Sequence, residues 1–229
     1  MNILAIETST KHFSLAVLKN DKLCVKQDVM LDKVLSDSII PAIDGTLKKA
    51  KLSFSEVDGF AVGLGPGSFT SLRVGMSTIK GFCLASGKKV VGVSSLDLIA
   101  CNVLPASQRD ICVIVDAKRA MVYAAIFRLG KSGLTRIGKY RLLEIKDLLP
   151  QIKKNTTFVG DGIALYREAI EAYFAKTKIH ITFEQESLWL PKAEHLAFLA
   201  LDRFKKKKDD NINKLLPLYL YPEDCQVRR

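Results

Sequence analysis

Two acidic residues are the side chains of this sequence with the clearest capacity for chemistry. Glu7 and Asp116 each directly follow a short apolar segment of the kind that forms a buried strand. Carboxylates in such positions can bind Mg²⁺ or orient an attacking water. They can equally cap a turn by accepting hydrogen bonds from backbone N–H groups. We expect the capping role for both residues.

A glycine-rich segment from Gly63 to Arg73, with the sequence GLGPGSFTSLR, is the second candidate site. An apolar stretch precedes it and apolar residues at helical spacing follow it, which predicts a strand, a glycine loop and a helix. The exposed N–H groups and the dipole of such a helix start attract anions. The spacing completes neither a Walker P-loop nor a dinucleotide-binding fingerprint. A phosphate-binding turn and a tight turn that binds nothing therefore both stay open.

Metal and nucleophile chemistry has little support in the sequence. The three histidines, His12, His180 and His195, are far apart, so none forms a ligand pair four residues apart on a helix. We find neither a G-x-S-x-G elbow nor a recognisable Cys–His pair. The five cysteines have no C-x-x-C spacing, which fits a reducing cytoplasm. We expect a non-catalytic, cytoplasmic protein with no metal site and no membrane association.

The formal net charge of +11 raises the question of nucleic-acid binding. The lysines are mostly scattered, and the one run, Lys205 to Lys208, closes a predicted helix. Cations at a helix C-terminus interact favourably with the helix dipole, so a solvated helix end explains this run.

The order of predicted elements repeats along the 229 residues. The first half reads as three strands, a helix at 33–51, a strand at 58–63, a helix at 68–86 and a strand at 89–93. The second half repeats this order less regularly from residue 111 onward. Duplicated β-β-β-α-β-α units are typical of the actin/Hsp70/sugar-kinase (ASKHA) superfold. We therefore predict an α/β fold with two actin-like domains, at 1–104 and 105–192, and a C-terminal tail at 209–229.

Five motifs fall in the same order as in a known family. The central one matches G-x-G-P-G-S-F-T-G-[LV]-R, with Ser71 in place of the last glycine. The five matching segments are Ile6-Glu7-Thr8, Gly63–Arg73, Val115–Tyr123, Val159-Gly160-Asp161-Gly162 and Leu218-Tyr219-Leu220. With these motifs the chain resembles the TsaB (YeaZ) family, whose members take part in making the threonylcarbamoyladenosine modification of tRNA.

The resemblance implies a non-catalytic activating subunit. Such a protein pairs with a TsaD-type catalytic paralogue, helps recruit a TsaE-type ATPase and forms a homodimer when free. The complex transfers threonylcarbamoyl to adenosine 37 of tRNAs that read ANN codons, and tRNA meets this subunit only indirectly. The resemblance also implies that a C-terminal helix at 193–208 packs back on the first domain. The alternative is a self-sufficient ATP-binding enzyme or a glycoprotease-like hydrolase of the same superfold.

The resemblance further suggests two sets of site residues. The partner-binding set lies on the two helices of the first domain: Leu35, Ile39, Phe69, Leu72, Arg73, Met76 and Ile79. A vestigial nucleotide site would comprise Glu7, Thr8, Ser9, Asp116, Gly160, Asp161 and Gly162. We expect no required cofactor, and weak ATP or ADP binding stays open.

Overall fold

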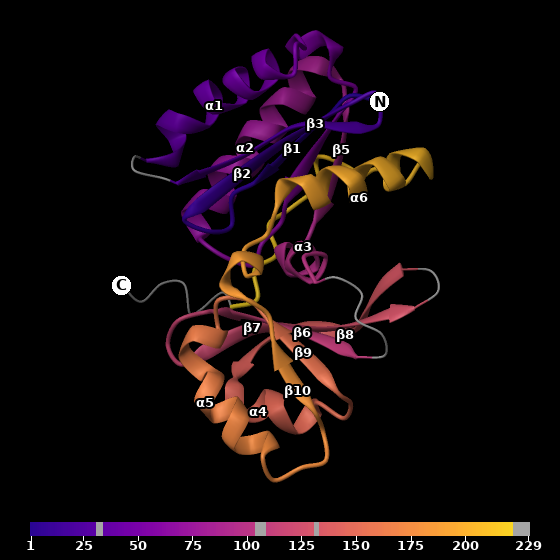
Figure 1. Cartoon of the computed structure of the whole chain (residues 1–229). Helices are drawn as coiled ribbons and strands as arrows, with labels where there is room; N and C mark the ends of the chain where they lie inside the picture. The colour runs from indigo at the N-terminus through magenta and orange to yellow at the C-terminus, as the bar shows by residue number, and fades with distance from the viewer. Residues whose placement is uncertain (31–33, 104–108, 131–132, 222–229) are drawn as a thin grey trace. The chain divides into compact units, whose positions relative to one another are not determined.

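The computed structural model describes residues 1–30, 34–103, 109–130 and 133–221 (Figure 1). The chain divides into two compact units. Unit 1 comprises Met1–Leu98 and Pro191–Leu218, and unit 2 comprises Ile99–Leu190 with the segment from Tyr219. The domain boundary predicted between residues 104 and 105 lies outside the described residues.

Unit 1 is built on a five-stranded sheet with the order β3-β2-β1-β4-β5. Its strands are β1 (Ile3–Glu7), β2 (His12–Lys19), β3 (Lys22–Met30), β4 (Gly59–Gly63) and β5 (Lys89–Val93). The central strand β1 pairs antiparallel with β2 and parallel with β4. Both β1 and β4 are buried along their whole length, as the apolar runs Ile3–Ile6 and Gly59–Gly63 predict.

Helices cover both faces of this sheet (Figure 1). Alternate residues of β1 point to opposite faces, so Leu4 and Ile6 join one core cluster while Ile3 and Ala5 join another. The first cluster contains α1 (Leu35–Lys49) and α2 (Phe69–Ser86), and the second contains α6 (Ala193–Lys205). A short helix, α3 (Ser95–Ala100), follows β5.

Two helices have boundaries that differ from the prediction. Helix α1 starts at Leu35, after Val34 in extended conformation, rather than at residue 33, which lies outside the described residues. Helix α6 ends at Lys205 rather than at residue 208. Lys207 has a positive φ of 53°, a left-handed conformation that stops a helix.

The segment after α6 covers the outer edge of β5. The Asp210 N–H donates to the Val90 carbonyl (2.9 Å), and the Gly92 N–H donates to the Asp210 carboxylate (2.8 Å). The Arg203 guanidinium donates to the same carboxylate (2.7 Å). These bonds satisfy groups that an open sheet edge would leave exposed.

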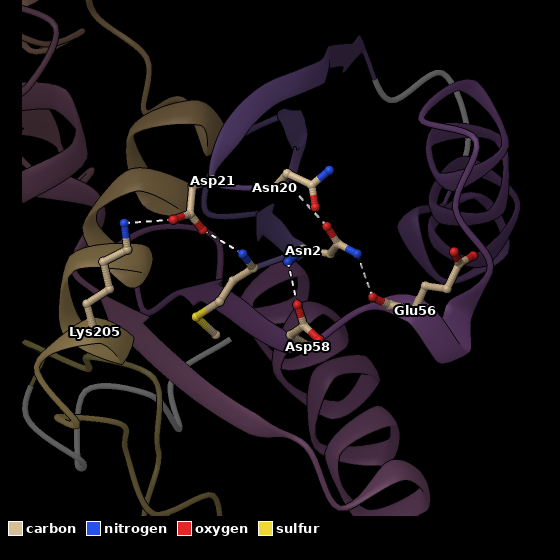
Figure 2. A network of polar contacts seen from close by, with 7 residues as sticks. Asn2, Asn20, Asp21, Glu56, Asp58 and Lys205 are labelled. Carbon is tan, nitrogen blue, oxygen red and sulfur yellow. Dashed lines mark hydrogen bonds and ion pairs between the residues drawn. The ribbon is translucent and has the colours of Figure 1, made fainter.

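A polar network around Asn2 connects three parts of unit 1 (Figure 2). The Asn2 side chain accepts a hydrogen bond from the Asn20 N–H (3.0 Å) and donates to the Glu56 carbonyl (2.9 Å). Its backbone N–H donates to Asp58 (2.7 Å). The start of β1 is thereby joined to the β2–β3 turn and to a 3₁₀ helix, η1 (Phe54–Glu56), before β4.

Unit 2 repeats the strand order of unit 1 with the order β10-β9-β6-β7-β8. Its strands are β6 (Asp110–Asp116), β7 (Met121–Gly130), β8 (Gly133–Glu144), β9 (Thr156–Val159) and β10 (Ile181–Phe183). Strand β6 pairs antiparallel with β7 and parallel with β9, as β1 does with β2 and β4. The other elements are α4 (Ile145–Leu148), η2 (Leu149–Gln151), α5 (Ile163–Phe174) and η3 (Glu186–Leu188).

Candidate functional sites

The glycine loop between β4 and α2 is bound to the segment that follows β1. The Ser68 N–H, at the N-cap of α2, donates to the Ser9 carbonyl (2.8 Å). On the other side of the loop, the Gly65 carbonyl accepts a hydrogen bond from the Ser95 N–H (2.8 Å). The loop is therefore held at two points by backbone hydrogen bonds within unit 1.

Two glycines are required by this close packing. A Cβ atom on Gly63 would lie 2.0 Å from Oε2 of Glu7, and one on Gly67 would lie 2.2 Å from the carbonyl oxygen of Ser9. Neither distance is compatible with non-bonded contact. These glycines make room for Glu7 and Ser9, which explains their presence without a bound phosphate.

A third glycine, inside α2, allows the helix to approach Thr8. A Cβ on Gly75 would lie 2.4 Å from Oγ1 of Thr8. The Thr8 hydroxyl donates to the Ser71 carbonyl (3.0 Å), so it is already used by the helix. Ser71, which replaces a glycine of the family motif, also shares a hydroxyl–hydroxyl hydrogen bond with Ser68 (2.9 Å).

Glu7 is completely buried and bonded within unit 1. Its carboxylate accepts hydrogen bonds from the Ser9 N–H (2.6 Å) and from the Ser95 hydroxyl (2.8 Å). Burial raises the pKa of Glu7, although the hydrogen bonds from Ser9 and Ser95 act in the opposite direction. In this arrangement Glu7 joins the end of β1 to the following turn and to α3.

The corresponding acidic residue of unit 2 has a different environment. Asp116 is partly exposed, and its carboxylate accepts the Lys118 N–H (2.8 Å) and forms an ion pair with the Lys118 ammonium. Although partial burial opposes ionisation, these interactions with Lys118 lower the pKa of Asp116. The Asp116 N–H donates to Asp161 (2.9 Å), whose pKa is raised by burial and by the Asp116 charge.

The glycines beside Asp161 pack on the backbone of β6. Gly160 has a positive φ of 110°, and a Cβ there would lie 2.2 Å from the Ile114 carbonyl oxygen. That carbonyl accepts the Gly162 N–H (3.1 Å). The residues predicted for a vestigial nucleotide site thus fall into two groups, three in unit 1 and four in unit 2, each brought together within its own unit.

The β6–β7 turn contains a feature that the sequence did not reveal. Lys118, Arg119 and Ala120 all have positive φ, between 52° and 64°. The Tyr221 hydroxyl donates to the Ala117 carbonyl (2.8 Å) at the base of this turn. A tyrosine hydroxyl from the C-terminal segment therefore supports this turn.

Five of the seven residues predicted to bind a partner lie in the core of unit 1. Their exposed fractions are 5% or less because the apolar stripes of α1 and α2 face the sheet; they are Leu35, Ile39, Leu72, Met76 and Ile79. The other two are at the surface, with the Arg73 guanidinium 3.8 Å from the ring centroid of Phe69. Phe69 is 39% exposed.

Other apolar side chains of the same helix pair are more exposed. Ile40 of α1 is 50% exposed, Leu84 of α2 is 72% exposed and Val34, at the N-cap of α1, is 66% exposed. In the sequence, these residues can be recognised only as apolar residues outside the main helical stripe.

The described part of the chain offers neither a cluster of metal ligands nor a membrane-spanning helix. Within residues 1–30, 34–103, 109–130 and 133–221, no group of three or more His, Cys, Asp or Glu side chains could hold a metal ion. None of the helices in these same ranges is both long and apolar enough to span a bilayer.

Comparison with solved structures identifies the class of fold. Two structures from Pseudomonas aeruginosa, a YeaZ protein and a protein similar to peptidase YeaZ, superpose with TM-scores of 0.80 and 0.81. They are 23% and 22% identical, and each comparison covers 96% of this chain and 99% of the other. An activator of 2-hydroxyisocaproyl-CoA dehydratase from Clostridium difficile, with 12% identity, covers 92% of this chain and 99% of its own length at a TM-score of 0.50. The predicted actin-like fold with duplicated units is confirmed.

Sequence comparison then identifies the family. A family model described as "TsaD: tRNA N6-adenosine threonylcarbamoyltransferase" matches residues 31–226. The TsaB protein of Bacillus subtilis is 27% identical, with 100% of this chain and 97% of the relative covered. The TsaB protein of Buchnera aphidicola (from Acyrthosiphon pisum) is also 27% identical, with 93% and 96% covered. The chain belongs to this family, among its TsaB (YeaZ) members.

The contact between Gly75 and Thr8 can be tested by a pair of glycine substitutions in α2. Gly75→Ala should lower the free energy of unfolding by about 1–3 kcal/mol, because the new methyl group overlaps the Thr8 side chain. Gly81→Ala is the matched control, since a Cβ there meets no atom within 4 Å. It should raise the free energy of unfolding by about 0.5–1 kcal/mol. Urea denaturation measures both, and equal effects would contradict the packing of α2 on Thr8.

The buried state of Glu7 predicts a pH dependence of stability. Because burial raises its pKa above the ordinary value of 4.5, the folded protein binds the Glu7 proton more tightly than the unfolded chain does. The stabilisation that comes from this tighter proton binding is fully present below the pKa of Glu7 in the unfolded chain. It is lost as the pH rises through the pKa of Glu7 in the folded protein. Glu7→Gln does not titrate, so its free energy of unfolding should increase relative to that of the native chain from about pH 4 to pH 8. A difference that stays constant across this range in urea denaturation would rule out a raised pKa.

Proposed function

We propose that this chain is the non-catalytic activating and scaffold subunit of the complex that puts threonylcarbamoyl on adenosine 37 of tRNAs reading ANN codons. The observation that carries the proposal is the match to TsaB relatives over nearly the whole of both chains. Those relatives are named as tRNA threonylcarbamoyladenosine biosynthesis proteins. A role in the same biosynthesis is the direct reading of this match.

The geometry around Glu7 supports a structural role for the end of β1. Its carboxylate is buried and accepts hydrogen bonds from Ser9 and Ser95, and the Thr8 hydroxyl is used by α2. A magnesium-dependent enzyme would need such groups turned toward its substrate. Any nucleotide binding by this chain would therefore be weak and not required for its activity.

We place the contact with a TsaD-type paralogue on the outer faces of α1 and α2. Both helices cover the same face of the unit 1 sheet (Figure 1). Both also carry exposed apolar side chains. The aromatic ring of Phe69 with the guanidinium of Arg73 adds the residue types that are enriched at interfaces. The same surface would pair two copies when the chain is free, and the paired subunits would recruit a TsaE-type ATPase. Activation follows if this chain binds the active arrangement of its paralogue more tightly than the inactive one.

A transfer assay with purified proteins tests the proposed function. Threonylcarbamoyl transfer to a tRNA transcript should require this chain together with the TsaD-type and TsaE-type proteins. The chain in place of the paralogue should give no product. Product formed without the paralogue would instead favour the self-sufficient enzyme, as would calorimetry that shows tight, magnesium-dependent ATP binding abolished in Glu7→Ala.

The partner surface can be tested by charged substitutions at exposed positions. Ile40→Glu and Leu84→Glu should each raise the dissociation constant for the paralogue by about tenfold or more, because a carboxylate would be buried at the interface. Phe198→Glu is the matched control, since Phe198 is 45% exposed on α6, which packs on the opposite face of the sheet. It should leave the dissociation constant unchanged, as measured by calorimetry. Equal weakening in all three variants would remove the assignment to α1 and α2.

A further inference from the structure

The edge strand β8 contains an irregularity that brings basic side chains together. Ala124 of β7 pairs with Arg141 of β8, and Ile126 pairs with Ile137. Strand β7 advances by two residues between these pairs, whereas β8 advances by four, so residues 138–140 bulge out of the ladder. Gly138 has a positive φ of 80° that permits the bulge. Bulges at sheet edges commonly redirect side chains toward a functional surface.

Arg136 gives this bulge a defined shape. Its Nε donates to the Gly138 carbonyl (3.0 Å), and its guanidinium lies 3.7 Å from the ring centroid of Tyr140. The ring and the guanidinium thus form one stack on β8. Arg136 and Lys139 are exposed and Tyr140 is half-buried, so the stack lies at the surface of unit 2.

Within the described ranges, the basic side chains of the bulge form no ion pairs. Nη1 of Arg141 is buried without a hydrogen-bond partner, and Lys139 makes no ion pair with any residue of the described ranges. Glu144, the one acidic residue of β8, is paired with Lys146 (2.8 Å). A buried N–H without an acceptor is costly, and no acid of the described ranges offsets the charge of Lys139 beside it.

The lysine run at the end of α6, Lys205 to Lys208, differs from the bulge because some of its charges form ion pairs. Lys205 pairs with Asp21 (2.7 Å; Figure 2). Lys206 pairs with Asp202 (2.7 Å), so half of the four charges are already matched within unit 1. The β8 bulge therefore offers more unmatched charge, together with an aromatic ring that the lysine run lacks.

We propose that the β8 bulge, residues 136–141, is a direct RNA contact of this chain. Lys139, the exposed cation beside the stack, would bind a backbone phosphate, and the Tyr140–Arg136 stack would receive an unpaired base. Both kinds of contact are typical of the recognition of single-stranded loops in RNA, whereas an acidic protein segment would use only the charges. Such a contact goes beyond the proposed function, in which tRNA meets this subunit only through its complex. It rests on that function solely for the choice of tRNA as the RNA.

Binding of an unmodified tRNA transcript to the isolated chain tests this proposal. The variant Arg136→Gln/Lys139→Ala should bind about tenfold more weakly than the native chain, as measured by fluorescence anisotropy at low salt. The slope of log affinity against log salt should fall by about one, because Lys139 is the phosphate-binding cation that the variant removes, whereas Arg136 belongs to the stack. The control Lys207→Ala/Lys208→Ala removes two charges from the lysine run and should change the affinity by less than about twofold.

A second variant tests the stack without changing the charge. Tyr140→Leu should weaken binding about fivefold or more while the salt slope stays the same, because stacking on a base does not release counterions. Thermal unfolding of each variant confirms that it is folded. If Arg136→Gln loosens the bulge, Lys139→Ala alone should still lower the salt slope by about one.

Several outcomes would overturn the assignment. These are equal weakening by the bulge and lysine-run variants, no binding by the native chain at low salt, or displacement of the RNA by polyglutamate at equal charge concentration. The last result would favour an acidic protein as the occupant. None of these measurements uses the paralogue, so a failure here leaves the activation assay as a separate test of the proposed function.

Discussion

The close contact between the end of β1 and the glycine loop is the constraint on which the arrangement of unit 1 depends. Glu7 and Ser9 occupy space that is available only because Gly63 and Gly67 have no side chains. The loop then leads into α2 with Ser68 as its N-cap, bonded to the Ser9 carbonyl. The position of α2 on the sheet, and with it the surface proposed for partner binding, follows from this contact.

The two units use the same strand order but treat their acidic residues differently. Glu7 is buried with a raised pKa, whereas Asp116 is partly exposed with a lowered pKa and a Lys118 partner. The equivalent strand ends therefore make different local contacts: Glu7 is bonded to Ser9 and Ser95 inside unit 1, and Asp116 is bonded to Lys118 at the surface of unit 2.

The fold could be predicted from the sequence because its signals are local. Apolar runs indicated the buried strands, and helical spacing indicated α1 and α2 to within a few residues. The exposed apolar side chains of α1 and α2 could not be predicted in the same way, because the regular apolar stripe of α2, which includes Met76 and Ile79, lies in the unit's own core. Exposed apolar residues such as Leu84 lie outside this stripe, so the helical spacing of apolar residues does not single them out. The β8 bulge was also unpredictable, since strand register depends on pairing with β7 rather than on the β8 sequence.

The distribution of charge also becomes interpretable only with the structure. From the sequence, Lys205 to Lys208 is the most prominent basic feature, yet Asp21 and Asp202 neutralise half of it. Arg136, Lys139 and Arg141 are separated in the sequence by uncharged residues and attract less notice. The bulge places them beside a tyrosine ring, and none of the three forms an ion pair with a residue of the described ranges. Phosphate groups bind most readily to cations that are not already paired with acids and that are held in a fixed geometry. By this criterion the β8 bulge of unit 2 is a better candidate for RNA contact than the lysine run of unit 1.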